Sequence, residues 1–546
     1  MLIGSKCIGV YPPEELHKRG LLFAGLTELF PIAFKPFLPG ISSEVDACVF
    51  LGRSDSIAES LGVPCYVYEK LPIRTVSATN KVTFASTTQL HKAIRGQTLV
   101  ESSSRELRCC SAKDGDTIYA TVEDNPVWTV RGVIHHVSVD LPHLAENDLL
   151  HPHFLTDRWL GLLPFIHFLR HVTADVDWQL PALTACFVID DPNLHALTYG
   201  DLDFRRVAQA ARSGNYHVAI ATVPMDAWYV NQNVARLFKE YSRHLSLTVH
   251  GNDHTRCELT EQGDNQLSRL GHALRRVDLL EQKAGLDVSR VMVAPHEACS
   301  EGTADLMLKL GYEGMTMKLS KLLYWVRDKR WPVECGLRNV IWMGSGFPIL
   351  RRFRLRDCFT QARLAAFLGQ PIVAYGHHSD CSLDILGNSA GTINSIGVQW
   401  ADLKSIMRSN YRTKTTGDLL QIQMGSRHIK LIVPEAISHI SVERPWMQHA
   451  DTEFLVYKDG DGGPRRLLAG PVTEPFDVTP GSEVAIQALP KDRVDYQNLA
   501  TPPVRAWSMI RRVLVETRDR LKPLVLPTIS QTETRFRPRE KGANDR

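Results

Sequence analysis

The chain has 546 residues, of which 44% are hydrophobic and 23% are charged, a balance typical of soluble globular proteins. This length exceeds what one compact core supports, so we expect about three or four domains. The net charge of +3 is small and excludes the strongly basic character of a protein whose main partner is a nucleic acid.

The sequence carries no sign of export or membrane insertion. Its first residues lack the basic region and long apolar stretch of a signal peptide. No apolar run reaches the roughly 18 residues needed to cross a bilayer, so we expect no transmembrane segment and a cytoplasmic protein. The 11 cysteines include no Cys-x-x-Cys pair, which argues against a disulfide framework and against a cysteine-rich zinc module. Nothing in the sequence sets the oligomeric state.

Residues 1–150 are predicted to form an α/β domain. Buried strands are expected at residues 47–51 and 64–68, and strand-like runs on either side of residues 123–125 predict a β-hairpin. The stretch 116–140 is similar to the end of the non-catalytic, glutamine-amidotransferase-like domains that accompany carbohydrate enzymes. Because no nucleophile elbow or phosphate loop occurs here, we expect a scaffold or docking role.

Residues 151–412 alternate between apolar strand-like runs and amphipathic helical stretches. The expected strands are 186–189, 217–222, 245–249, 291–294, 314–317 and 371–375, and the expected helices include 233–243, 266–283 and 302–310. Repeated strand–helix–strand units favour parallel strands with helices outside them, as in an α/β barrel or an open sheet. In such folds the active site gathers at the carboxyl ends of the strands.

The sequence changes character after residue 412. Residues 413–500 contain short alternating strands separated by turn residues, which predicts an antiparallel β domain, a small sandwich. In residues 501–546 a basic amphipathic helix is expected over 503–521, followed by a disordered polar tail.

Two polar motifs follow predicted strands of the central region. Asp-Asp-Pro at 190–192 and His-Gly-Asn-Asp-His at 250–254 each come directly after an apolar run. Either motif alone has an ordinary explanation, a capped turn or a pair of surface histidines. Together, one carboxylate and two imidazoles can hold a divalent metal with positions open for water and substrate. The spare carboxylate could then act as the general base.

On these residues the chain resembles the NodB-like polysaccharide deacetylases of carbohydrate esterase family 4, as a divergent member. The family's first motif ends a strand with two aspartates and its second is His-x-x-x-His, and both occur here in that order within residues 181–412. The resemblance implies a NodB-like distorted (β/α) barrel. It also implies that Asp190 is the catalytic base and that Asp191, His250 and His254 bind the metal.

The family's third motif is altered in this chain. Where the family has Arg-x-Pro followed by an aromatic residue, residues 293–297 read Val-Ala-Pro-His-Glu. The resemblance implies that Pro295 and His296 line the substrate groove, but it leaves the base without its usual arginine. Arg290 and Lys318 are the candidates to replace that arginine.

The family's last motif is a strand-end histidine that acts as general acid. The comparable stretch here contains adjacent histidines, and His377 is favoured because it is nearer the strand, while His378 remains open. Asp380 could orient either imidazole by a hydrogen bond, or cap the following segment. His195 could lie at the rim of the pocket or simply decorate a loop.

The implied function is metal-assisted removal of an N-acyl group, acetyl in the first instance, from an amino sugar or polysaccharide. Zinc fits two imidazoles and one carboxylate best, although cobalt or manganese could use the same ligands. Two other functions remain open. One is a catalytically inactive carbohydrate-binding protein, favoured by the altered third motif, and the other is a hydrolase of another C–N bond, such as a cyclic amide.

Overall fold

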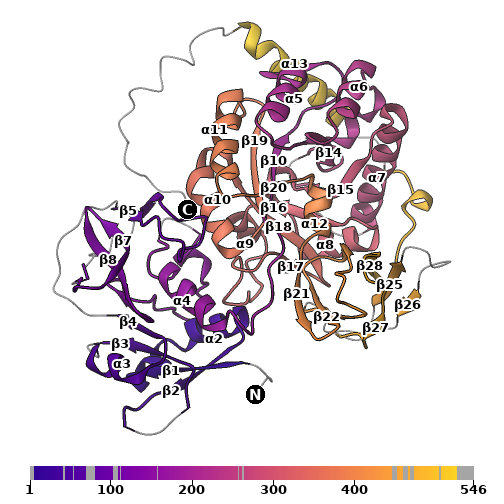
Figure 1. Cartoon of the computed structure of the whole chain (residues 1–546). Coiled ribbons are helices and arrows are strands. Elements are labelled where there is room, and N and C mark those ends of the chain that lie inside the picture. Colours follow the sequence, from indigo (N-terminus) through magenta and orange to yellow (C-terminus); the bar gives the residue numbers. More distant parts are fainter. Residues whose placement is uncertain are drawn as a thin grey trace.

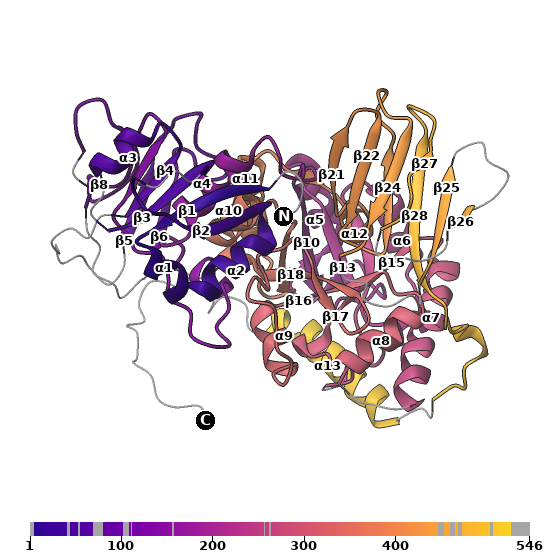
Figure 2. The ribbon, with the colours of Figure 1, turned by 90° about the horizontal axis from the view of Figure 1, so that it is seen from below.

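The computed structural model of the chain contains three groups of β-strands that follow one another along the sequence (Figures 1 and 2). A mixed sheet forms the N-terminal part, a closed barrel the middle, and two small sheets the part that follows. The structure describes all residues except 1–4, 41–43, 53–54, 69–79, 102–108, 111, 156–157, 256, 261–263, 446–451, 459–464, 468–471, 503–505 and 526–546.

The N-terminal sheet has the strand order β2–β1–β3–β4–β9–β8–β7–β5–β6. Its parallel strands are β1 (Lys6–Tyr11), β2 (Ile32–Pro36), β3 (Ala47–Leu51), β4 (Cys65–Tyr68) and β9 (Ile134–Val137). Its antiparallel strands are β5 (Asn80–Phe84), β6 (Thr98–Glu101), β7 (Thr117–Val122) and β8 (Asn125–Arg131). Strands β7 and β8 form the predicted hairpin.

Four helices accompany this sheet: α1 (Pro13–Lys18), α2 (Gly20–Leu29), α3 (Asp55–Leu61) and α4 (Leu163–Thr173). Helix α4 comes later in the chain and packs Phe165 and Phe168 against Tyr66 of β4. A single large hydrophobic cluster therefore runs from the N-terminal sheet through α4 into the helices around the barrel.

In the described part of the chain, seven parallel strands close a barrel, because β10 pairs with both β13 and β19. The strands are β10 (Thr184–Asp190), β13 (Val218–Thr222), β14 (Leu245–Val249), β15 (Val288–Val293), β16 (Gly314–Met317), β18 (Phe347–Arg354) and β19 (Ile372–His377). Each strand expected from the sequence is present, and β18 is an additional one. Two short strands add to this sheet outside the closed barrel: β17 (Ile341–Met343) pairs with β18, and β20 (Gln399–Trp400) pairs with β10.

Helices surround the barrel (Figure 1). They are α5 (Phe204–Ser213), α6 (Gln232–Glu240), α7 (Asp264–Ala284), α8 (Glu301–Lys309), α9 (Leu319–Trp325), α10 (Cys358–Leu368) and α11 (Leu383–Asn394). Helix α5 shows how the sequence specifies them. Asp203 caps its first turn by accepting hydrogen bonds from two backbone N–H groups, and its buried residues recur at helical spacing.

The barrel interior is filled by small and branched side chains on alternate strand positions, such as Cys186, Val188, Val291 and Val293. Helix α12 (Leu403–Arg408) packs Leu403, Ile406 and Met407 against this cluster, on the side where β10 begins. The interior is therefore a packed core, and the chemistry lies at the opposite, carboxyl end of the strands.

The C-terminal sheets pack around a second hydrophobic cluster. One sheet contains β21 (Tyr411–Thr416), β22 (Leu419–Met424), β24 (His439–Glu443) and β27 (Phe476–Asp477), and the other β23 (His428–Ile432), β28 (Glu483–Pro490), β25 (Thr452–Lys458) and β26 (Arg465–Leu467). The prediction of an antiparallel domain is wrong for one pair, since β22 and β24 are parallel. Between β22 and β24 the chain passes through β23, which belongs to the other sheet. This crossover connection lets β24 run in the same direction as β22.

The last described element is α13 (Ala506–Val525), which lies at the end of the barrel that is uppermost in Figure 1 and contacts the loops after β10 and β14. It covers most of the range in which the sequence predicts a basic helix, whereas the tail predicted to be disordered lies outside the described residues. Among the described helices, none combines the length and apolar character that crossing a bilayer requires. The cysteines are present as thiols rather than as disulfides.

Candidate active site

The two motifs meet at one end of the barrel. Asp190 is the last residue of β10 and His377 the last of β19, and the register of these neighbouring strands pairs the two residues directly. His250 follows β14, and Pro295 begins the short 3-10 turn η3 (Pro295–Glu297) after β15. The carboxyl ends of parallel strands thus bring together residues that are far apart in the sequence.

Asp191, His250 and His254 form a cluster of metal-ligand type. One ligand atom from each lies within 4.8 Å of the other two. Oδ1 of Asp191 is 3.5 Å from Nε2 of His250 and 3.2 Å from Nε2 of His254. This oxygen is buried and accepts no hydrogen bond from the described residues. A buried carboxylate oxygen aimed at two imidazole nitrogens fits a divalent cation.

The surroundings of the cluster fix the orientation of its ligands. Nδ1 of His250 lies 2.9 Å from the carbonyl oxygen of Val293, and donation of its proton there leaves the Nε2 lone pair facing Asp191. Burial is the main cause that lowers the pKa of His254 well below its usual value and so favours the neutral imidazole that a metal ligand requires. Asp191 has a φ of 88°, an uncommon conformation for a non-glycine residue that is held here by its loop.

The loop between the two histidines requires glycine at position 251. Gly251 has a φ of 68°, and a Cβ there would lie 1.8 Å from Oε1 of Glu258 and 2.6 Å from Cγ of Pro295. Glu258 is buried and accepts hydrogen bonds from the backbone N–H groups of Asn252 and Asp253. Burial raises the pKa of Glu258 to about 7. This carboxyl group therefore shapes the loop from inside the protein.

Asp190 faces a cation that the sequence did not identify. Nη1 of Arg352, on β18, donates a 3.0 Å hydrogen bond to Oδ1 of Asp190, and Nε of Arg352 donates one of 3.0 Å to Oε1 of Glu297. The guanidinium lies 3.9 Å from the centre of the Tyr375 ring. Burial alone would lower the pKa of Arg352, but Asp190 and Glu297 outweigh it and raise that pKa.

The two arginine replacements considered from the sequence are therefore wrong. Arg290 is bound by Asp278 and Glu281 of α7, at 2.8 and 2.6 Å. Lys318 contributes its backbone N–H to Glu297, and its ammonium lies over Tyr375 rather than on Asp190. One feature of the sequence could have identified Arg352. It lies two positions after Leu350 in an apolar run, and in a β-strand residues two positions apart point to the same side, here the barrel interior.

The adjacent histidines at the end of β19, His377 and His378, have different surroundings. Nε2 of His377 lies 4.0 Å from Oδ2 of Asp191, its Nδ1 lies 3.6 Å from Oδ2 of Asp380, and half of its side chain is exposed. His378 is buried against the ring of Tyr199, with Asp519 of α13 3.7 Å away. His377 is therefore the histidine that reaches the cluster, with Asp380 beside it.

The two residues predicted to line the groove differ in exposure. Pro295 is buried beneath the 250–254 loop, as its closeness to Gly251 shows. His296 is exposed, and its ring centre lies 4.7 Å from that of His254. A role in substrate binding stays a prediction for both residues, and the accessible side chain is that of His296.

Helix α13 borders the site through charged side chains. Arg512 donates a 2.8 Å hydrogen bond to the carbonyl oxygen of Asp191 and pairs with buried Asp226 at 2.6 Å. Arg511 donates to the carbonyl oxygen of His254. His195 lies 3.3 Å from Glu516, so it faces α13 rather than an open rim. The sequence predicted this helix but gave no sign that it holds the ligand loops.

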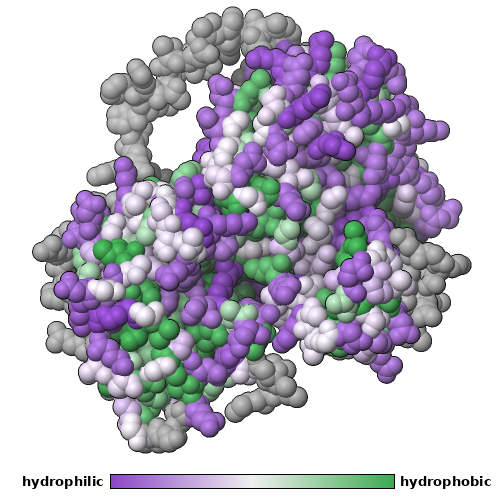
Figure 3. All heavy atoms as spheres, in the orientation of Figure 1, coloured by the Kyte–Doolittle hydropathy of each residue, from purple (hydrophilic) through white to green (hydrophobic). Residues whose placement is uncertain are grey.

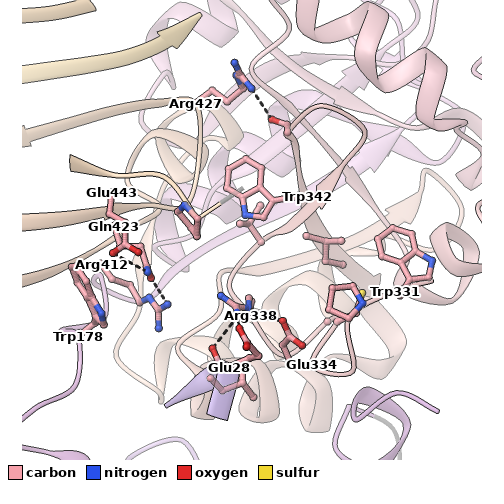
Figure 4. Close-up of a pocket in the computed structure, with 18 of the residues that line it drawn as sticks. Glu28, Trp178, Trp331, Glu334, Arg338, Trp342, Arg412, Gln423, Arg427 and Glu443 are labelled. Carbon is pink, nitrogen blue, oxygen red and sulfur yellow. Dashed lines mark hydrogen bonds and ion pairs between the residues drawn. The ribbon is translucent and has the colours of Figure 1, made fainter. Parts of the chain in front are cut away.

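A separate cavity of about 1840 Å³ lies where the three parts of the molecule meet (Figures 3 and 4). None of the candidate site residues lines it. Arg338 crosses from the barrel region to Glu28 of α2, and Arg427 of the C-terminal part donates to the carbonyl oxygens of Ser345 and Gly346. These contacts join the three parts beside the cavity.

Comparison with known proteins finds solved structures but no sequence relatives. No protein-family profile matches the chain, and no curated protein matches it. Among the similar structures is one from Mycobacterium smegmatis described as a polysaccharide deacetylase, with 15% identity, 42% of this chain and 91% of the other aligned, and a TM-score of 0.31. A family 4 carbohydrate esterase from Streptomyces lividans, in complex with acetate, has 13% identity, 42% and 97% coverage, and a TM-score of 0.27.

A third similar structure is a family 4 acetyl xylan esterase from Clostridium thermocellum in complex with cobalt. It has 11% identity, covers 41% of this chain and 89% of the other, and has a TM-score of 0.25. The structural neighbours are thus carbohydrate esterase family 4 proteins. The roles of individual residues follow from the geometry of this chain.

Proposed function

We propose that the chain is a metal-dependent hydrolase with a divergent NodB-like barrel, which removes N-acyl groups from an amino sugar or polysaccharide. The observation that carries the proposal is that the two adjacent carboxylates, Asp190 and Asp191, have different binding partners. Asp191 faces two imidazoles with a buried, unbonded oxygen, while Asp190 is held by the guanidinium of Arg352. One carboxylate is thus arranged to bind a cation, and the other to accept a proton.

In this proposal Asp191, His250 and His254 hold the metal, most suitably zinc. When bound, a divalent cation would polarise the acyl carbonyl and lower the pKa of water at the site. Asp190 takes the proton from the water whose oxygen attacks the acyl carbon. His377 then gives a proton to the nitrogen as the C–N bond breaks, leaving a free amine and a carboxylic acid. Asp380 lies where it can orient the ring of His377.

The alternative of an inactive binding protein has lost its main support. It rested on the missing arginine of the third motif, and Arg352 supplies a cation at Asp190 from another strand. We further propose that residues 151–412 form the catalytic domain, that residues 1–150 form a non-catalytic domain and that residues 413–500 form a β domain.

The direct test is release of acetate from N-acetylglucosamine oligomers by the full chain. Activity should disappear after chelation and return with zinc, and Asp191→Asn should lower both metal content and turnover. Asp287→Asn is the matched control, since Asp287 is 71% exposed and pairs only with Lys404 among the described contacts. Bound zinc without acetate release, while a cyclic amide is opened, would support the other C–N hydrolase. A protein that binds no metal would contradict the proposal.

A further inference from the structure

Helix α13 turns its charged face toward the protein and its apolar face toward solvent. Trp507, Ile510, Val513 and Leu514 are 70, 50, 60 and 59% exposed. At about 100° per residue these four positions fall on one side of the helix. Its amphipathic pattern is therefore reversed relative to a helix that covers the core of a globular protein.

Buried ion pairs hold the helix in this rotation. Arg512 and Asp519 are 6 and 5% exposed, and both face the barrel. Arg512 pairs with Asp226, and Arg520 donates hydrogen bonds to the side chain of Asn193 and the carbonyl oxygen of Thr198. Rotating the apolar face inward would leave Asp226 buried without its cation, which is strongly unfavourable. The outward apolar face is thus built into the structure.

The surface beside α13 is also aromatic. Trp228 and Tyr229 are 65 and 46% exposed, and both pack on His195, which in turn contacts Glu516 of α13. Trp507 adds a third exposed aromatic ring from the helix. Tryptophan and tyrosine are the residues enriched where a protein meets the headgroup region of a membrane, because each ring has an apolar body and a polar edge.

The charge of the helix favours an anionic partner. Residues 506–525 contain five basic and two acidic residues, a net charge of +3, and the chain as a whole has the same net charge. Arg512 is neutralised by Asp226, but the side chain of Arg518 is 70% exposed and lies on the same side of the helix as Trp507, so positive charge remains on the outward surface. A second copy docked through the same face would bring two such helices together and repel them, whereas an anionic bilayer attracts basic residues near its surface.

We propose that α13, with Trp228 and Tyr229, lies on an anionic lipid bilayer and places the carboxyl end of the barrel at the membrane surface. An amphipathic helix with basic residues and exposed tryptophan and leucine binds in this way, with its apolar side in the headgroup boundary. Because α13 also holds the carbonyl groups of Asp191 and His254, its attachment couples the bilayer to the candidate active site. Membrane binding itself does not depend on the proposed reaction.

Flotation of the full chain with vesicles tests the proposal. The protein should float with phosphatidylcholine vesicles that contain phosphatidylglycerol, float less with phosphatidylcholine alone, and detach in high salt. Ile510→Ser/Leu514→Ser should lower the partition coefficient at least about tenfold. Ile432→Ser is the matched control, because Ile432 is 71% exposed on β23 of the C-terminal part, and it should bind as the wild type does.

The possible outcomes distinguish a lipid bilayer from a second copy of the chain as the partner of this face. Membrane binding is supported if the double variant loses flotation while the wild type and Ile432→Ser keep it. Equal flotation of the wild type and the double variant, or no flotation of either, overturns the proposal. A dimer in vesicle-free solution that the double variant dissociates also overturns it, and assigns the face to a second copy of the chain. None of these measurements uses enzymatic activity, so they are independent of the proposed function.

Discussion

Arg352 donates a 3.0 Å hydrogen bond to Asp190, and the side chains of both residues are at most 3% exposed. The same guanidinium binds Glu297, so one cation serves two carboxylates inside the barrel. Two buried negative charges without a cation would be costly, and this makes Arg352 as important for stability as for the position of Asp190.

We therefore expect Arg352→Gln to lower the free energy of unfolding by ~3–5 kcal/mol, the range found when one partner of a buried pair is removed. Urea unfolding measures this change. Arg354→Gln, two positions along the same strand at an exposed site, is the control and should cost much less. The double variant Arg352→Gln/Glu297→Gln should recover part of the loss. An Arg352→Gln protein as stable as the control would show that the pair contributes nothing.

Gly251→Ala should disrupt the loop that carries His250 and His254. The new Cβ would overlap Glu258 and Pro295, in addition to the cost of a positive φ. Gly417→Ala is a control for the backbone cost alone, because Gly417 has a φ of 62° and nothing within 4 Å of the added Cβ. We expect zinc content to fall in Gly251→Ala and to stay normal in Gly417→Ala. Equal zinc content in the two variants would contradict this account of the loop.

His377 and His378 should behave differently despite being neighbours. His377→Ala should reduce kcat by about 100- to 10,000-fold, the range for loss of a general acid, with metal content unchanged. His378→Ala should keep most of the activity, because its ring packs on Tyr199 near α13. Acetate release by the two metal-loaded variants measures the difference. The reverse ranking would move the acid to His378.

The contact between His195 and Glu516 should make the docking of α13 depend on pH. Burial opposes protonation of His195, but Glu516 and the Asp226 carbonyl outweigh it and raise the pKa of His195. Such a contribution is present below the unfolded pKa of about 6.5 and is lost as pH rises through the raised folded value. Trp228 and Tyr229 pack on the ring, and Arg520 binds Glu516.

Hydrogen exchange of the α13 amides, corrected for intrinsic rates, should therefore show weaker protection at about pH 8 than at about pH 6. His195→Gln should remove this difference. His439→Gln is the control, because His439 pairs with Asp418 in the C-terminal part, far from α13 in the sequence. If the pH effect persists in His195→Gln, another group is responsible for it.

The sequence predicted those parts of the fold and site that depend on local pattern. The strands of the barrel were visible as apolar runs, and Asp190, Asp191, His250 and His254 were visible because they directly follow such runs. Strand β18 was missed because its arginines hide the apolar pattern, and Arg352 was missed with it. The parallel pairing of β22 with β24 depends on a crossover between two sheets, which no local pattern encodes.

The contacts of α13 could not be predicted from the sequence for a similar reason. Its basic, amphipathic composition was readable, but the sequence did not show which face of the helix packs on the protein. Ion pairs with residues about 300 positions earlier, such as Asp226, set that orientation. Long-range pairing of charges decides the outcome here, and it can be seen only in the folded chain.

The most direct test of the central claim is the turnover of Asp190→Asn compared with the wild type, both loaded with zinc and assayed for acetate release. The substituted side chain would keep the shape of the aspartate but could not take a proton from water. The account predicts a normal zinc content and a kcat reduced by at least about 100-fold. Full turnover by the zinc-loaded variant would contradict the assignment of Asp190 as the base.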